Sequence, residues 1–105
     1  MAWLWLAVAA VFEIGWAIAL KRAAEEPGVA IWAATVAAMV GSVAFLALAV
    51  RDLPIGTAYA VWTGTGAAGV FLAGILLFGE PSDLPRLASV GLIVAGVAGL
   101  KFLTP

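Results

Sequence analysis

The sequence contains no cysteine and no histidine, and it has few charged residues. Without these two residue types, disulfides, thiolate or imidazole metal sites and any catalysis that depends on them are excluded. Charged residues make up 10% of the 105 residues and hydrophobic residues 66%, which leaves too few charges to cover a soluble domain. The net charge of −1 offers no attraction to nucleic acid. The composition therefore predicts an integral membrane protein with no metal, no other cofactor and no nucleic-acid partner.

Apart from one acidic residue, Glu13, the charges are confined to short segments that separate long apolar runs. Each run has about the 20 residues that a helix needs to cross a bilayer. Turn residues mark the breaks, including Pro27-Gly28 before the second run, Pro54 before the third and Pro85 at the start of the fourth. The sequence predicts one all-α transmembrane domain over residues 1–105, with helices at about 2–21, 29–50, 54–78 and 84–103.

The first run could be mistaken for a secretory signal peptide. It lacks the basic segment that precedes the apolar part of a signal peptide, because its first positive side chain is Lys21. We expect it to be a retained transmembrane helix.

Glu13 lies in the middle of this first helix. No basic side chain lies within two helical turns of it, because the nearest is Lys21 at the end of the helix. A charged residue at mid-helix costs about 2.5–3.5 kcal/mol of insertion free energy, and each large aliphatic residue or Phe returns about 0.3–0.6 kcal/mol. An ionisable residue kept in a membrane helix at that cost marks a functional site. Glu13 is therefore the first candidate for binding a cation or a proton.

Residues of the first and third predicted helices offer further groups to such a site. Trp16 lies one turn after Glu13 on the same helical face, and its indole could attract a cation by about 2 kcal/mol when desolvated. In the third helix one face carries Tyr59, Trp62, Thr63 and Gly66. Tyr59 could instead belong to the aromatic belt at the membrane boundary.

The second helix is nearly featureless, and Ser42 is a candidate only if other polar groups converge on it. A membrane serine commonly bonds to its own helix backbone one turn back. Both readings stay open from the residues alone.

Glycines mark two places of close packing or bending. Gly64 and Gly66 allow the third helix to bend or another backbone to approach it. Gly91, Ala95 and Gly99 form a ridge of small residues on the fourth helix, the pattern that lets membrane helices pack closely, either within the chain or against a second copy.

The distribution of basic residues gives no preferred orientation in the membrane. Following the predicted crossings, Lys21, Arg22 and Arg86 lie on one side, and Arg51, Lys101 and the N-terminal amine lie on the other. This balance could arise by chance in a small protein, or the chain could insert in both orientations and dimerise head to tail. Because transporters commonly need two inverted halves, an antiparallel homodimer with both Glu13 side chains at one shared site would supply the missing half.

The sequence resembles the small multidrug resistance family of bacterial inner-membrane exporters over its whole length. The resemblance rests on Phe12-Glu-Ile-Gly-Trp16 through Lys21, Leu53-Pro-Ile-Gly-Thr-Ala-Tyr-Ala-Val-Trp-Thr-Gly64, Phe78-Gly-Glu-Pro81 and the fourth-helix ridge ending at Lys101. It implies an antiparallel, dual-topology homodimer that exchanges protons for cations through a paired glutamate. Glu13 matches that glutamate, and Tyr59 and Trp62 match the binding-site aromatic residues of the family.

Within the family, Trp16 together with Ser42 resembles the guanidinium-exporter subtype. Guanidinium is planar and carries a fork of N–H donors that suits a carboxylate bidentately. The resemblance therefore implies proton-coupled export of guanidinium or singly substituted guanidinium ions across the inner membrane by a multi-pass protein, with Ser42 and Tyr59 hydroxyls ordering the carboxylates.

Two alternatives stay open. The chain could export quaternary ammonium compounds, or it could be a membrane scaffold or accessory subunit in which Glu13 bonds permanently to a partner helix. An enzyme is not expected, because one acid and scattered hydroxyls provide no nucleophile and base.

Overall fold

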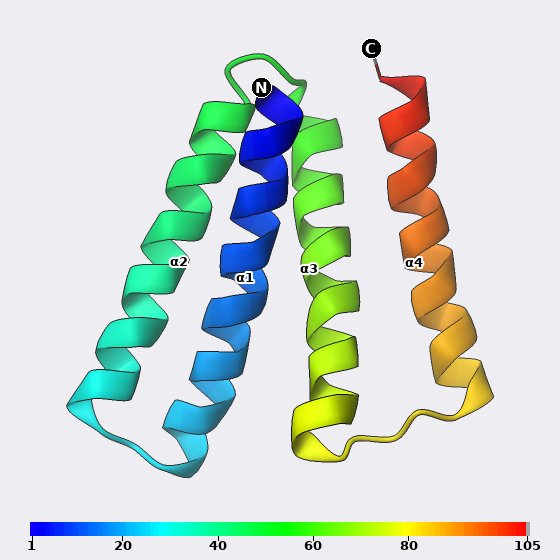
Figure 1. Ribbon diagram of the computed structural model, residues 1–105. Helices are drawn as coiled ribbons and strands as arrows, with labels where there is room; N and C mark the ends of the chain where they lie inside the picture. The colour runs from blue at the N-terminus through cyan, green and yellow to red at the C-terminus, as the bar shows by residue number, and fades with distance from the viewer. Residues whose placement is uncertain (105) are drawn as a thin grey trace.

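A computed structural model describes residues 1–104, and within these residues the chain forms four long helices joined by short loops (Figure 1). The bounds are α1, Ala2–Glu25; α2, Val29–Ala49; α3, Ile55–Phe78; and α4, Leu84–Leu103. Each helix is long and apolar enough to cross a membrane. The described part of the chain is therefore all-helical, as the sequence predicts.

Three helix ends differ from the predicted bounds: the end of α1, the end of α2, which is one residue earlier at Ala49, and the start of α3. α1 runs four residues beyond its predicted end at 21, because Lys, Arg, Ala and Glu are good helix formers and continue the helix to Glu25. α3 begins at Ile55, one residue after Pro54, which caps it. At its other end α3 stops at Gly79, whose φ of 64° is the left-handed conformation that glycine adopts readily.

The start of α4 is fixed by Asp83, its N-cap residue. The Asp83 carboxylate accepts a hydrogen bond from the backbone N–H of Arg86 at 3.4 Å and also pairs with the Arg86 guanidinium. The hydrogen bond from the Arg86 side chain is the main reason why the pKa of Asp83 lies below its usual value. Asp83, the N-cap residue, precedes the membrane-spanning helix Leu84–Leu103.

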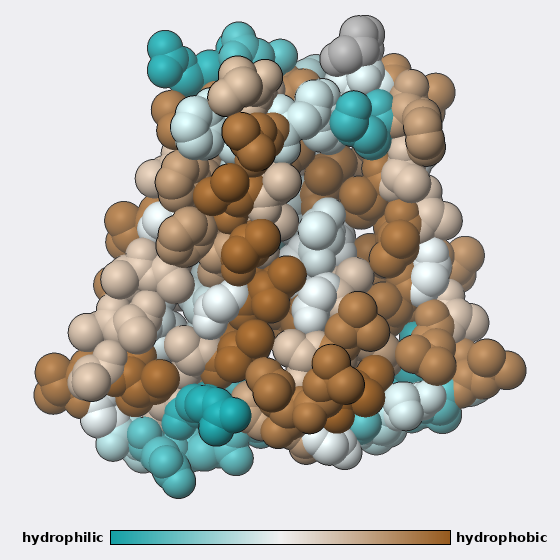
Figure 2. Space-filling view, viewed as in Figure 1, coloured by the Kyte–Doolittle hydropathy of each residue, from teal (hydrophilic) through white to brown (hydrophobic). Residues whose placement is uncertain are grey.

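The helices stand side by side in one layer, in the order α2, α1, α3, α4 (Figure 1). The chain measures 43 × 34 × 16 Å, so it is thin in one direction. Hydrophilic residues gather at two opposite ends, and the surface between them is mostly hydrophobic (Figure 2). The Lys21–Glu26 segment and the α3–α4 loop lie at one end, and both termini and the α2–α3 loop lie at the other, as the predicted crossings require (Figure 1).

The core lies at the end of the layer that holds the N-terminus. It is built from small and medium residues, which let the backbones of α1, α2 and α3 approach closely: Ala2, Leu6, Ala9, Leu46, Ala49, Leu53, Ala58 and Val61. Beside it, Phe45 of α2 stacks on Trp5 and Phe12 of α1, with ring centroids 5.6 and 5.5 Å apart. α1 and α2 are consequently the most closely packed pair.

α4 is the exception to this packing. Its backbone lies close to α3 alone, and none of its residues 84–103 is buried. The two helices lie close together at Gly64 of α3, where an added methyl group would come within 2.6 Å of Val97 Cγ2. α4 therefore leaves most of its surface available for contacts outside the chain.

Candidate functional site

Glu13 lies half-buried on α1, in the centre of the apolar layer. Its Oε2 atom is shielded from solvent, and no donor within residues 1–104 hydrogen-bonds to it. Buried polar atoms in proteins nearly always have a partner, and an unpartnered buried carboxylate oxygen is costly. This oxygen is therefore available to a donor from outside residues 1–104.

Four of the predicted site residues line one cavity of about 250 Å³ between α1 and α3. They are Glu13, Trp16, Thr63 and Gly66. The other lining residues are Ala17, Ala67 and Val70, which the sequence reasoning did not single out. Helical spacing could have found them, because Ala17 lies four residues after Glu13, and Ala67 and Val70 continue the face of Thr63 and Gly66.

Gly66 is the point at which α3 touches the carboxylate. A methyl group added there would lie 2.5 Å from Glu13 Oε2 and 2.9 Å from its Cγ. One turn away, Gly69 is covered in the same way by the side chain of Ile14. α3 is a continuous helix through Gly64 and Gly66. The two glycines admit side chains of α4 and α1, respectively.

Thr63 lines the cavity, and its hydroxyl proton is already donated to a backbone carbonyl. Its hydroxyl donates to the backbone carbonyl of Tyr59 at 2.8 Å, one turn back on α3. Because the hydroxyl proton is committed to that carbonyl, the oxygen lone pairs remain to accept a hydrogen bond. A ligand with N–H donors suits this arrangement.

Ser42 and Trp62 form a second polar group, separate from the Glu13 cavity. The fully buried Ser42 hydroxyl donates to the Ala9 carbonyl of α1 at 2.7 Å and accepts the Trp62 indole N–H at 2.9 Å. Ser42 therefore does not bond to its own helix, unlike Thr35, whose hydroxyl donates to Ile31 at 2.8 Å. The Ser42 proton is directed at a backbone carbonyl rather than at Glu13.

Tyr59 completes the aromatic face of α3. Its ring meets that of Trp62 edge-on, with centroids 5.5 Å apart, and 54% of the residue is exposed. Within the described chain, Tyr59 and Trp62 lie beside the cavity without lining it.

The ridge of small residues on α4 faces away from the other helices. A methyl group added at Gly91 or Gly99 would meet no atom of residues 1–104 within 4 Å, and Ala95 is exposed. Nothing in the described chain packs against this ridge.

The fold and site together define a multi-pass helical membrane protein with one unpartnered carboxylate and an aromatic side chain beside it. Residues 1–93 match the family described as "Small Multidrug Resistance protein". Proteins named "Guanidinium exporter" from Citrobacter freundii and Salmonella typhimurium are each 50% identical to this chain over 104 residues. The matched residues cover 99% of this chain and 99% of each relative. The protein of that name from Escherichia coli strain K12 is 47% identical over the same length.

The chain belongs to the small multidrug resistance family, as the sequence motifs predict. It is a multi-pass protein of the inner membrane. The names of these relatives describe transport rather than enzymatic activity.

Proposed function

We propose that this protein exports guanidinium across the inner membrane in exchange for protons, and that it is not an enzyme. The observation that carries the proposal is the shielded Oε2 atom of Glu13, which has no hydrogen-bond donor within residues 1–104. The substrate class follows from the relatives named as guanidinium exporters, which match nearly the whole chain.

The chemistry of the cavity suits a small, flat cation with N–H donors. The carboxylate of Glu13 can accept two parallel N–H bonds from guanidinium, and the Thr63 oxygen can accept another. The Trp16 indole borders the carboxylate and can attract the cation through its ring face. A tetraalkylammonium ion has no N–H group and would leave these acceptors unpaired.

Proton coupling follows from competition for the same carboxylate. A protonated Glu13 has no charge with which to hold a cation, and a cation-bound Glu13 excludes the proton. If the carboxylate faces one side of the membrane at a time, alternation between the two ligands moves protons inward and guanidinium outward.

We infer further that the working unit is an antiparallel homodimer. A layer 16 Å thick cannot enclose a substrate, and its α4 ridge has nothing packed against it within residues 1–104. A second, inverted copy would close the open cavity and bring its own Glu13 to the same site. Close contact between the ridges of the two copies at Gly91, Ala95 and Gly99 is the geometry that such residues allow.

The remaining predicted site residues receive distinct roles in this proposal. Trp62 and Tyr59 form the aromatic wall beside the Glu13 cavity, and the second copy would bring this wall to the substrate. Ser42 acts through Trp62, because its hydroxyl accepts the indole N–H and is itself anchored on Ala9.

An outward-directed proton gradient should drive guanidinium into liposomes that contain the purified protein, and tetramethylammonium should be refused. A site built for hydrogen bonding rejects an analogue without donors, because buried acceptors are then left unpaired. Substrate-driven proton flux measured for both cations is the test. Equal transport of both would favour the quaternary ammonium exporter, and no transport of either by the chain alone would favour the accessory subunit.

The same assay tests the role of Trp16. Trp16→Gly should widen the cavity, lower the flux with guanidinium and raise the flux with bulkier cations, because the indole limits the volume beside the carboxylate. Unchanged selectivity in this variant would mean that Trp16 does not form a wall of the substrate site.

Gly66→Ala should weaken guanidinium binding by about ten- to a hundredfold, which corresponds to the loss of one hydrogen bond to a charged group. The added methyl would lie 2.5 Å from Glu13 Oε2, so the carboxylate must move away from the cavity wall. Gly15→Ala is the matched control, because a methyl there meets no atom of residues 1–104 within 4 Å. Isothermal titration of guanidinium into both purified variants measures the difference, and equal affinities would contradict the assigned carboxylate position.

A further inference from the structure

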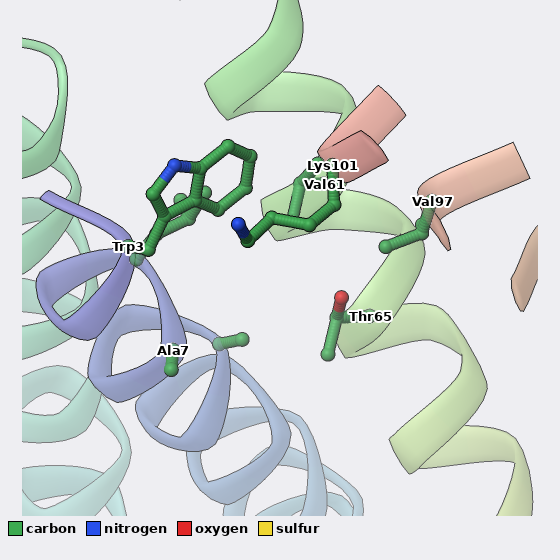
Figure 3. A pocket seen from close by; sticks show the side chains of 8 residues that line it. Trp3, Ala7, Val61, Thr65, Val97 and Lys101 are labelled. Carbon is green, nitrogen blue, oxygen red and sulfur yellow. The ribbon is translucent and has the colours of Figure 1, made fainter. Parts of the chain in front are cut away.

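A second cavity lies between α1, α3 and α4, at the end of the molecule that holds both termini (Figure 3). Its volume is about 180 Å³, and most of its walls are apolar, including Ala7, Ala10, Val61 and Val97. It exists because α4 packs on α3 alone and because α1 presents alanines toward the gap. The cavity is distinct from the one that Glu13 lines, and no role proposed above uses it.

One end of this cavity carries a positive charge. The Lys101 ammonium group lies 4.4 Å from the centroid of the Trp3 ring and points into the space between α1 and α3 (Figure 3). The one salt bridge within residues 1–104 joins Asp83 and Arg86, so no carboxylate of the described chain neutralises Lys101. The indole holds the ammonium group in place, and a negative charge can still approach it from outside.

The apolar walls and the positive charge of Lys101 together indicate the chemistry of a molecule that would bind in this cavity. An apolar cavity does not hold water stably, because water needs several polar partners. Within the apolar layer, a lipid acyl chain is an apolar group that can enter it. Lys101 forms no salt bridge within residues 1–104 and lies over Trp3 at the end of a transmembrane helix, where a single cation adds to the attraction of anionic lipid headgroups.

We propose that the groove between α1, α3 and α4 binds one anionic phospholipid, with its phosphate on Lys101 and an acyl chain in the cavity. The bound chain would fill the gap that α4 leaves beside α1. This inference concerns a different site from the proposed export of guanidinium, and its test does not depend on transport.

The test is the retention of phosphatidylglycerol relative to phosphatidylcholine by the full-length protein, measured by native mass spectrometry from mixed vesicles. The wild type should retain phosphatidylglycerol preferentially. Lys101→Gln should weaken its binding about fivefold, the effect of one cation near the membrane surface. Lys101→Arg should keep the preference. Arg51→Gln removes an exposed cation on the same side of the membrane and should leave the preference unchanged.

The acyl-chain part of the proposal has its own variant. Ala7→Leu fills the cavity without touching the charge and should also weaken retention, whereas Ala47→Leu, on an exposed face of α2, should not. Ala7 is itself exposed, so the longer side chain does not disrupt the core.

Three results would overturn the proposal. The first is a wild type that shows no preference for phosphatidylglycerol, or a preference that survives Lys101→Gln. The second is displacement of phosphatidylglycerol by inorganic phosphate alone, which would indicate a soluble anion. The third is an Ala7→Leu variant that retains lipid fully and loses self-association, which would place a second copy of the chain in the groove.

Discussion

Glu13→Gln should abolish guanidinium binding and proton-coupled flux while leaving the protein folded. Glutamine keeps the shape of the side chain and removes the charge that both ligands need. No hydrogen bond is lost within residues 1–104, because Oε2 has no partner there. A neutral amide at mid-membrane is also cheaper to bury than a carboxylate, so thermal unfolding should occur at the wild-type temperature or above.

The pH dependence distinguishes a binding role from a structural one. In the wild type, the apparent affinity for guanidinium should weaken as the pH falls, because protonation of Glu13 removes the negative charge that holds the cation. Lowering the guanidinium concentration should correspondingly ease proton uptake. In Glu13→Gln, any residual binding should be independent of pH.

Glu26→Gln is the matched control for this substitution. Glu26 is exposed at the C-terminal end of α1, outside the apolar layer, and should retain wild-type affinity and pH dependence after the same change. Titration calorimetry of the three proteins at several pH values makes the comparison. Retention of pH-dependent guanidinium binding by Glu13→Gln would contradict the proposed mechanism.

The sequence predicts the helices well because each apolar run is long enough to span a bilayer and each break carries its own turn residues. The error at the end of α1 has a simple cause. The charges from Lys21 onward predict the end of the membrane segment, but the helix continues past that point to Glu25 because nothing before Pro27 stops it. Hydropathy predicts which part of a helix lies within the membrane. Where the helix itself ends depends on residues such as proline and glycine, which interrupt its backbone hydrogen bonds.

The site was less accessible to sequence reasoning, because it depends on how helices are placed against one another. Spacing within one helix puts Trp16 beside Glu13, and both line the same cavity. Spacing does not reveal that Gly66 faces Glu13 while Gly64 faces Val97, since this depends on the register between α3 and its two neighbours. The bond from Ser42 to Ala9 likewise crosses from α2 to α1.

Forcing every copy of the chain into one orientation should abolish transport. The balance of three basic groups on each side leaves orientation undetermined, and the positive-inside rule predicts that a small added bias fixes it. Leu103→Lys with Thr104→Arg adds two positive charges at the end of α4, where Leu103 is 83% exposed and its replacement disturbs no packing. Glu26→Lys with Ser82→Lys adds two at the opposite end, again at exposed positions.

Each doubly substituted protein expressed alone should insert in a single orientation, which cysteine accessibility at an added site on each side can verify. Neither should confer export of guanidinium, because an antiparallel dimer needs one copy of each orientation. Expressed together, the two proteins should restore export, since each supplies the subunit of one of the two opposite orientations in the membrane. In a further mixture, one of the two biased proteins also carries Glu13→Gln. This mixture should not restore full export, because the shared site would then hold a single carboxylate. Normal export by one uniformly oriented protein would exclude the antiparallel dimer and would require that parallel copies, or a single chain, enclose the substrate.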